Sequence, residues 1–367
     1  MMKSRRLSWA ARPLAAAVVI AFSAAPAIAA PDAKTVAAID RGLEFLEKAQ
    51  KENGCWSTAE FPGMTALALQ GFLLAPEAAK GHPETVKKGL GFIRASAKPD
   101  GGIYDKGMAN YNTSIALSTL LHADEETDLA RIEAARKFLV GAQKNEPDKK
   151  SEDGGFGYEP AGKRSRPDLD NTVFAVESLA LYRDKHKGEE PIGKEDLDWQ
   201  AAIDFVSRCQ NLTETNSATW ASDEPAEKGG FTYTPDGSGE GTHSYGTMTY
   251  SGLLSLIHAK VGAEDRRVKA AIDWLSRRYS IDENPGQGKQ GLYYYYFVMA
   301  KTLTAAKIDK LKAGEKEVDW RGELSAKLIS LQRADGSWAN ENGRWMEQDP
   351  VLATSYAVIA LSTLARE

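Results

Sequence analysis

The sequence predicts an all-α fold, an (α/α)6 toroid in which six helical hairpins close into a ring within one domain. Three observations lead to this prediction. Six amphipathic helical segments recur along the chain, a loop with a glycine and an aromatic residue follows each of them, and each loop leads into a second, strongly apolar helix. Repetition at this scale is typical of proteins whose units bury their hydrophobic faces against one another.

The first helix of each unit is expected in an outer layer, because one of its faces is polar. In the first unit, apolar residues recur at helical spacing at Val36, Ile39, Leu43 and Leu46. Five of the segments share an aromatic–aliphatic pair at the same place, and the sixth keeps only the aliphatic residue: Phe45-Leu46, Phe92-Ile93, Phe138-Leu139, Phe205-Val206, Trp274-Leu275 and Leu328.

The loop between the two helices of a unit combines glycine with an aromatic residue. Glycine suits a turn that leaves a helix, because it adopts a positive φ at little cost. The aromatic ring can then fold back onto the barrel. The six pairs are Gly54 and Trp56, Gly102 and Tyr104, Gly155 and Phe156, Gly230 and Phe231, Gly291 and Tyr293, and Gly336 and Trp338.

The second helix of each unit is apolar on nearly all sides, so we expect these helices to be buried around a central cavity. The fifth unit begins this helix with four consecutive tyrosines, Tyr293–Tyr296. The other units have a threonine near the same place: Thr65, Thr113, Thr172, Thr247 and Thr354. Long polar loops in the third and fourth units are predicted to cover a functional face.

Residues 1–30 have the features of a secretory signal peptide, with basic residues, a short apolar core and small residues at the end. Residues 31–367 would then form a single domain that is exported and is periplasmic or secreted. The twin arginine Arg5-Arg6 leaves the export route open. The first thirty residues carry four cations and no acid, so the remainder has a net charge of −9 instead of −5. This acidic balance argues against nucleic acid as a partner, and no later segment predicts a transmembrane span.

The chain has two cysteines, Cys55 and Cys209, which belong to the first and fourth units. In a ring of six units these two lie on opposite sides. A disulfide requires Cα atoms within about 7 Å. We therefore predict two free, mostly buried thiols.

Two stretches, "RGLEFLEKAQKENGCW" (residues 41–56) and "LISLQRADGSW" (residues 328–338), resemble the QW repeat of squalene–hopene and oxidosqualene cyclases. Related repeats build the β-subunits of protein prenyltransferases. The resemblance covers nearly the whole chain after residue 33 and implies a terpenoid cyclase/prenyltransferase-like barrel. Complete triterpene cyclases are about twice as long, and their reaction takes place between two domains. This sequence predicts a single domain.

The stretch Asp168–Thr172 is similar to the acidic motif of triterpene cyclases, with Asn171 where the last acid would stand. The resemblance implies that Asp170 protonates an alkene and that Asp168 or Asn171 orients it. The alternative is that Asp170 or Asn171 caps the third inner helix, with Thr172 in its first turn. Asn112 and Thr113 occupy the same place in the second unit, which has no acid beside them.

One or two of the rings of Tyr293, Tyr294, Tyr295 and Tyr296 are expected to face the cavity, with the rest wedged between helices, because successive residues of a helix point in different directions. Tyr111, Tyr158, Tyr245 and Tyr250 should enter from neighbouring units at similar depth. Such rings can stabilise carbocations, bind a flat or apolar ligand, stack on a sugar, or only fill the ring. His243, beside Glu240, either forms an acid–base pair or is a solvated loop residue.

Three functions are consistent with this sequence. The first is an exported cyclase/prenyltransferase-like protein that binds, and in the catalytic case cyclises, an isoprenoid. The second is a non-catalytic module of the cell envelope that binds a protein or a ligand. The third is a carbohydrate-active enzyme, for which Asp349, Asp168 and Asp170 are the candidate carboxylates. We expect no cofactor and no metal, because the histidines and cysteines do not cluster as zinc ligands do.

Overall fold

The computed structural model describes residues 32–76, 81–123, 125–149, 151–162, 165–186, 196–238 and 240–365. The expected signal peptide, residues 1–30, lies outside these ranges. Pro31–Glu367 form one compact unit. The regular secondary structure of the described part is almost all helical.

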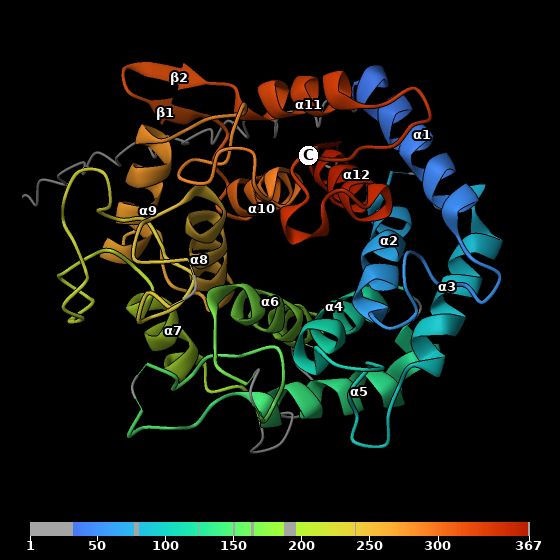
Figure 1. Ribbon diagram of the computed structural model, residues 1–367, viewed down its shortest axis with the longest axis horizontal. Helices are drawn as coiled ribbons and strands as arrows, with labels where there is room; N and C mark the ends of the chain where they lie inside the picture. Colours follow the sequence, from blue (N-terminus) through green and yellow to red (C-terminus); the bar gives the residue numbers. More distant parts are fainter. Residues whose placement is uncertain are drawn as a thin grey trace, which may run out of the picture. The chain divides into compact units, whose positions relative to one another are not determined.

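The described helices alternate along the chain between an outer and an inner layer (Figure 1). The outer layer contains α1 (Ala33–Ala49), α3 (Pro83–Ala95), α5 (Glu125–Ala142), α7 (Trp199–Arg208), α9 (Arg266–Arg277) and α11 (Trp320–Leu331). The inner layer contains α2 (Pro62–Leu74), α4 (Ala109–His122), α6 (Leu169–Lys185), α8 (Gly246–His258), α10 (Leu292–Ala305) and α12 (Pro350–Ala365). Both layers match the helices that the sequence predicts.

The inner layer closes into a ring. Each inner helix contacts two others, in the order α2, α4, α6, α8, α10, α12 and back to α2. Helix α1 contacts both α11 and α12, so the first and last units also meet (Figure 1). These contacts confirm the predicted (α/α)6 toroid. A short antiparallel hairpin, β1 (Leu311–Ala313) and β2 (Lys316–Val318), lies between α10 and α11 and was not predicted.

A glutamine at the end of the outer helix links neighbouring units in four places among the described residues. Its side-chain NH2 group donates two hydrogen bonds of 2.9–3.1 Å. One goes to the carbonyl of a glycine in the loop of its own unit, and the other goes to a backbone carbonyl near the start of the next outer helix. The four glutamines are Gln50, Gln143, Gln210 and Gln332. The last of them reaches Ala38 of α1, so the same link joins the sixth unit to the first.

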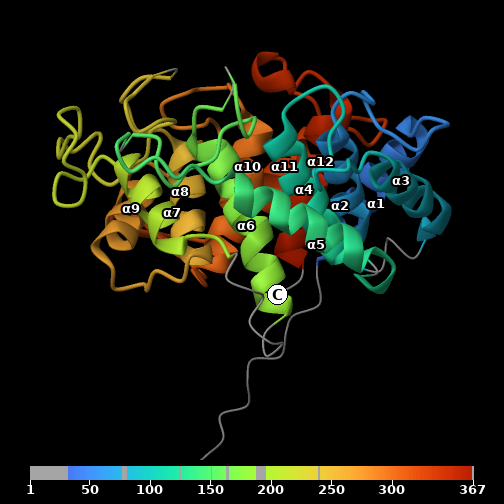
Figure 2. The same cartoon turned by 90° about the horizontal axis from the view of Figure 1, so that it is seen from below.

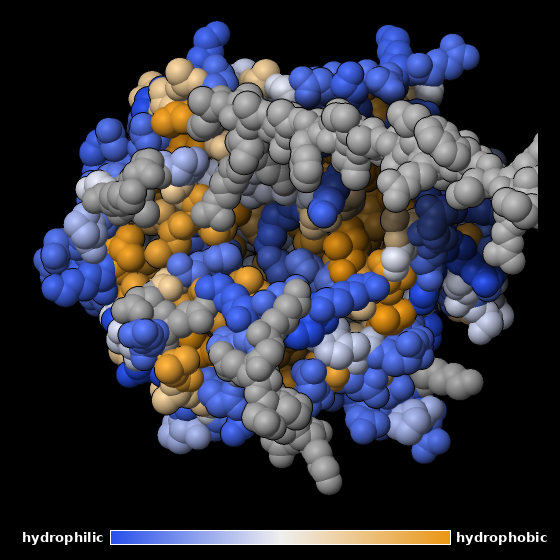
Figure 3. All heavy atoms as spheres, turned by 180° about the vertical axis from the view of Figure 1, so that it is seen from behind, coloured by the Kyte–Doolittle hydropathy of each residue, from blue (hydrophilic) through white to orange (hydrophobic). Residues whose placement is uncertain are grey.

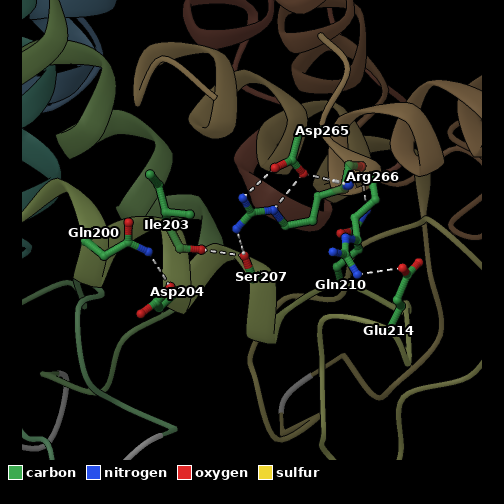
Figure 4. Close-up of polar contacts among 9 residues, drawn as sticks. Gln200, Ile203, Asp204, Ser207, Gln210, Glu214, Asp265 and Arg266 are labelled. Atoms are coloured by element: carbon green, nitrogen blue, oxygen red, sulfur yellow. Dashed lines mark hydrogen bonds and ion pairs between the residues drawn. The ribbon is translucent and has the colours of Figure 1, made fainter. Parts of the chain in front are cut away.

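Figure 4 shows one of these junctions, between α7 and α9. Gln210 follows α7 and donates to the Arg267 carbonyl in α9 at 2.9 Å. The Arg267 guanidinium group donates to both carboxylate oxygens of Asp265, at 2.7 and 2.8 Å, and to the Ser207 hydroxyl at 3.0 Å. Backbone and side-chain hydrogen bonds therefore hold successive outer helices in register.

The loop glycines of these junctions pack directly on the next outer helix. Gly54 has a φ of +86°, and a Cβ atom placed on it would lie 2.3 Å from the Lys88 carbonyl oxygen. Gly336, at φ +87°, would bring a Cβ atom within 2.3 Å of the Arg41 carbonyl oxygen. Both the conformation and the close approach of backbone to backbone require glycine.

The threonine of the inner helix anchors the aromatic loop. Its hydroxyl group accepts a hydrogen bond of 2.8–3.1 Å from the backbone N–H of the buried aromatic or aliphatic residue in the loop of the same unit. The acceptors are Thr65, Thr113, Thr172, Thr249 and Thr354. In the fourth unit the inner helix begins beside Thr247, as predicted, but the hydroxyl group that bonds the loop is that of Thr249. In the second unit, buried Ile103 takes the loop position expected for Tyr104, whose hydroxyl group bonds Asp100 instead.

All inner helices begin on the same face of the ring, and the longer loops gather there (Figure 2). Figure 3 looks at the opposite face, where polar side chains predominate around the rim and apolar ones lie further in. Of the described helices, none combines the length and the apolar character needed to cross a bilayer. Cys55 and Cys209 are both buried and free, as predicted.

Candidate functional site

A cavity opens at the face where the inner helices begin. The space within the cavity and at its mouth, open solvent included, measures about 1030 Å³. Its walls come mainly from the first turns of the inner helices and from the loops beside them. The residues that line it are Phe61, Met64, Met108, Tyr111, Tyr158, Asp170, Tyr233, Glu240, Tyr245, Thr247, Met248, Asn284, Gln287, Gln290, Gly291, Tyr294, Trp345, Met346, Glu347, Leu352 and Tyr356.

The helical repeat explains which side chain of each inner helix reaches the cavity. The loop-binding threonine points outward, and the residue two positions earlier stands about 200° around the helix, toward the lumen. In four units this residue lines the cavity, as Tyr111, Asp170, Thr247 and Leu352. In the fifth unit Tyr294 does so. A sequence rule of two residues before the threonine therefore finds one lining side chain in these four units. It gives Gly63 in the first unit, where Met64 lines the cavity instead, and it misses Met248 and Tyr356.

Asp168, and not Asp170 or Asn171, caps helix α6. The Asn171 backbone N–H donates to Asp168 Oδ1 at 2.8 Å, and the Asn171 side chain donates to Asp168 Oδ2 at 2.8 Å. The prediction that Asp170 or Asn171 caps the helix is therefore wrong. Asp168 and Asn171 bond each other, and the orienting role toward Asp170 that the resemblance implies stays a prediction.

Asp170 lies in the first turn of α6, and its carboxyl group lines the cavity. Among the described residues its buried Oδ1 atom has no hydrogen-bond partner, and the buried Tyr294 hydroxyl group also lacks a well-formed one. Burial raises the pKa of Asp170 to about 6, and nearby Tyr294 opposes this rise by favouring the carboxylate. A carboxyl group that titrates well above the ordinary range of aspartate, and that carries its proton in mildly acidic solution, thus faces an aromatic cavity.

Asp168 and Asp170 influence each other. Burial and the negative charge of Asp170 raise the pKa of Asp168 to about 8, against the N–H groups of Asn171 that lower it. Two nearby carboxyl groups in a buried setting avoid full ionisation, because like charges repel strongly where water is excluded. The pair therefore retains a proton into the neutral pH range.

Aromatic rings form the walls and floor of the cavity. Tyr294 stacks on Phe174 with ring centroids 6.0 Å apart and lies 5.4 Å from Tyr356. Tyr111 meets Phe174 edge-on at 5.2 Å. These rings come from α4, α6, α10 and α12, so they converge from four sides of the ring.

The tyrosine run divides as predicted, with one ring of the four in the cavity. Tyr294 lines it, and the other three are buried elsewhere. The hydroxyl groups of Tyr295 and Tyr296 donate to the Ser280 and Ile281 carbonyls at 2.7 and 2.6 Å. Tyr293 packs edge-on against Tyr296. These three anchor the start of α10 instead of contacting a ligand.

Of the other aromatic candidates, Tyr111, Tyr158 and Tyr245 line the cavity. Tyr250 does not, and its ring packs against Tyr295 at 5.6 Å. His243 also lies outside the cavity lining, with its side chain 86% exposed. Its Nδ1 atom lies 2.9 Å from Glu227 Oε1, so its acid partner is Glu227 and not Glu240.

Below the aromatic floor, an ion pair crosses the lumen. The Lys301 ammonium group of α10 contacts the Glu177 carboxylate of α6, and both side chains are 16% exposed. Lys301 also lies 4.6 Å above the Phe297 ring. Helices α6 and α10 are not neighbours in the ring, since α8 contacts both. The ion pair therefore joins two walls of the ring that are separated by α8.

Several lining residues were missed because they come from loops without a repeat. Glu347, fully buried, accepts a hydrogen bond from the Tyr294 backbone N–H at 2.7 Å and from Asn340 at 2.8 Å. Its carboxylate thus provides a hydrogen-bond acceptor for a backbone N–H group at the start of α10, and burial raises the pKa of Glu347. Trp345 and Met346, next to it in η2 (Arg344–Met346), have φ values of +61° and +63° and are about half exposed. Tyr356 and Tyr233 were also missed.

The carboxylates needed for glycoside hydrolysis do not gather as expected. Asp349 accepts from the Ser57 hydroxyl group and from the Val351 backbone N–H, so it is committed to the start of α12 and does not line the cavity. Asp168 is committed to α6. The described residues also contain no group of three potential ligands placed to hold a metal ion.

No family model and no curated protein matches this sequence. Solved structures do match it. The type II terpene cyclase MstE from Scytonema aligns with a TM-score of 0.55, at 13% identity, over 90% of this chain and 98% of the cyclase. That cyclase has also been solved with geranylgeranyl dihydroxybenzoate as its substrate.

Two further structures share the architecture. The GH76 α-mannanase of Bacteroides thetaiotaomicron has a TM-score of 0.58 at 12% identity, over 89% of this chain and 95% of the mannanase. Candida albicans protein geranylgeranyltransferase-I, complexed with GGPP, has a TM-score of 0.53 at 17% identity, over 89% of this chain and 90% of that one. At such identities the matches establish a terpene cyclase/prenyltransferase-like toroid fold, and unrelated chemistries share it.

Proposed function

We propose that this protein binds an isoprenoid in the aromatic cavity and that Asp170 protonates one of its double bonds. The observation that carries the proposal is the Asp170 carboxyl group, which faces the cavity, has a raised pKa and lacks a hydrogen-bond partner for Oδ1 among the described residues. A buried acid that is not used for folding is typical of a catalytic site.

The chemistry requires both a proton and a stabilised cation. The Asp170 O–H bond breaks as the alkene π electrons form a C–H bond, which leaves a carboxylate and a carbocation. Tyr294 favours the carboxylate once the proton has left. The faces of Tyr294, Tyr111 and Tyr356 can stabilise the cation while it closes a ring. Loss of a proton from the product cation completes an isomerisation that needs no redox cofactor.

Membership of the QW repeat family is part of this proposal. The four linking glutamines support it, because each precedes a glycine–aromatic loop as in the two stretches that resemble that repeat. Export of the chain, with cleavage of residues 1–30, remains a prediction from the sequence. A protein partner in the envelope is the alternative role for the loops at the mouth.

The carbohydrate-active alternative has less support. Of the three carboxyl groups that line the cavity, Glu347 is committed to the start of α10 and Glu240 to an ion pair with Arg344. A glycosidase needs two carboxyl groups available on either side of the scissile bond. Of these three carboxyl groups, only that of Asp170 is available for such a role.

The test is to incubate residues 31–367 with squalene and with polar polyisoprenoids and to identify products by mass spectrometry. Asp170→Asn should lower turnover at least about a hundredfold, because it removes the proton donor but keeps the shape of the side chain. Asp204→Asn, the same change on the exposed surface of α7, is the matched control and should have no effect. Turnover that survives Asp170→Asn would remove the acid assignment, and lipid bound without turnover would leave a binding protein.

A further inference from the structure

The mouth of the cavity has two chemically different sides. The side formed by α2, α4 and their loops presents Phe61, Met64, Met108 and Tyr111. The side formed by α8, α10 and the neighbouring loops presents Glu240, Asn284, Gln287 and Gln290. A ligand made only of hydrocarbon would leave the Gln287 and Gln290 side chains on the second side without hydrogen-bond partners, which costs free energy once water is displaced.

The polar side is rigidly held. Asn284 accepts from the Thr247 backbone N–H at 3.0 Å and donates to the Gln290 carbonyl at 3.1 Å, so it fixes the loop before α10 to α8. Asn340 donates to the Lys289 carbonyl at 2.7 Å and joins this loop to the loop before α12. Figure 1 shows these two loops side by side between α8, α10 and α12.

Two carboxamides on this side are available for a ligand. The side chains of Gln287 and Gln290 are half-buried, line the cavity, and have no hydrogen bond among the described residues. Glu240 stands nearby, held by the Arg344 guanidinium group, which lies 4.7 Å from the centre of the Trp345 ring. Amide and carboxylate groups in this arrangement can accept from hydroxyl or amide groups, and the glutamines can also donate.

The charge of the residues that line the cavity disfavours phosphate and diphosphate head groups. Three acids line the cavity, Asp170, Glu240 and Glu347, and no lysine, arginine or histidine is among the described lining residues. Arg344, which precedes the lining residue Trp345 in the chain, is already paired with Glu240. A phosphate or diphosphate would meet carboxylates in a poorly hydrated site, where like charges repel strongly.

We propose that the ligand is an amphiphile whose uncharged head, bearing hydroxyl or amide groups, binds Gln287, Gln290 and Glu240 while its hydrocarbon chain lies among the tyrosines. This inference rests on the proposed isoprenoid-binding function and narrows it to a substrate class. Prenyl diphosphates are outside that class.

The test compares three C20 probes bound to residues 31–367: geranylgeraniol, geranylgeranyl diphosphate, and the matching hydrocarbon without the hydroxyl group. Tryptophan fluorescence gives the dissociation constants. Geranylgeraniol should bind at least about tenfold more tightly than either of the other two. Gln287→Leu combined with Gln290→Leu should remove most of the preference over the hydrocarbon, whereas Gln200→Leu on the surface of α7 should keep it.

The Glu240→Gln variant tests whether the charge of Glu240 acts on the ligand, which a purely structural role would not predict. It removes a negative charge and frees Arg344, so the diphosphate should bind about tenfold more tightly than it binds the wild type. Equal binding of all three probes to the wild type, or tightest binding of the diphosphate, would overturn the inference and leave the cavity function intact. Preserved preference together with a lack of turnover would instead contradict only the acid role of Asp170. Failure of every probe to bind would remove both proposals.

Discussion

The glycine–aromatic loops and the first turns of the inner helices lie next to each other, yet they follow opposite rules. In the loops, the same glutamine link recurs in four described units, and the same threonine anchor recurs in five. In the first turns, the side chain that faces the cavity differs from one unit to the next. Residues that repeat specify the ring, and residues that break the repeat are those available for a ligand.

Hydrogen bonding shows the same contrast. The side-chain NH2 groups of the linking glutamines are satisfied by their own loop and by the next unit, as at Gln332, which bonds Gly336 and Ala38, although Gln210 Oε1 has no partner among the described residues. The cavity contains buried polar atoms without partners among the described residues, at Asp170 and Tyr294. Unsatisfied buried groups lower stability, so they persist where a function requires them. Substitutions in the two regions should therefore have opposite effects on stability.

The largest expected loss of stability comes from Gly336→Ala in the loop region. The new Cβ atom would meet the Arg41 carbonyl oxygen, and alanine disfavours a φ of +87°. We expect a loss of about 3 kcal/mol in the free energy of unfolding, measured by chemical denaturation. Gly141→Ala in α5 is the control, because nothing lies within 4 Å of its Cβ position and its φ is ordinary. The control should be neutral or slightly stabilising. Equal effects of the two changes would mean that the loop does not hold the ring together.

A smaller loss is expected from Gln332→Ala. It removes the hydrogen bond to Ala38, which joins the sixth unit to the first, and the hydrogen bond to Gly336 within the sixth unit, which together should cost about 1–3 kcal/mol. Ligand binding per folded molecule should not change, since Gln332 does not line the cavity. Gln348→Ala, an exposed glutamine near the mouth, provides the comparison. A Gln332→Ala protein of unchanged stability but weakened ligand binding would reverse the roles of the two regions.

In the cavity region, Asp170→Asn should increase stability, and more so as the pH rises. The pKa of Asp170 is raised to about 6 in the folded state, so its ionisation opposes folding. Stability of the wild type is complete below the unfolded-state pKa and falls as the pH rises through about 6. The variant does not ionise at this position, so its advantage in stability should grow from less than about 1 kcal/mol at pH 4 to about 3 kcal/mol at pH 8. Thermal unfolding across this range measures it, and a pH-independent difference would contradict the raised pKa.

The smallest effect should come from Tyr294→Phe. The Tyr294 hydroxyl group lowers the pKa of Asp170, so its removal should raise that pKa. The limb of the pH–rate profile that reports ionisation of Asp170 should then shift to higher pH, by less than about one unit. The ring is kept, so binding of the hydrocarbon chain should stay the same. Tyr295→Phe, which loses a bond to the Ser280 carbonyl outside the cavity, should leave the profile in place. A shift in the opposite direction would show that Tyr294 stabilises the protonated acid.

The same contrast explains what the sequence can predict. The repeats predicted both helical layers, the ring and the free thiols, because regular spacing translates directly into helix faces. They also placed one tyrosine of four in the cavity. The capping residue was placed too late in the chain, since Asp168, Asp170 and Asn171 are all good caps and only the geometry of the helix start selects among them. Glu240, Trp345 and Glu347 come from irregular loops, where no periodicity relates position to direction.

The central claim is that Asp170 passes a solvent-exchangeable proton to a double bond in the aromatic cavity. The most direct measurement is turnover of a polyisoprenoid in D2O, followed by mass spectrometry of the product. The account predicts one deuterium atom on a carbon that was part of the double bond, and almost no product from Asp170→Asn. A product without deuterium, or a labelled product formed equally well by the variant, would contradict it.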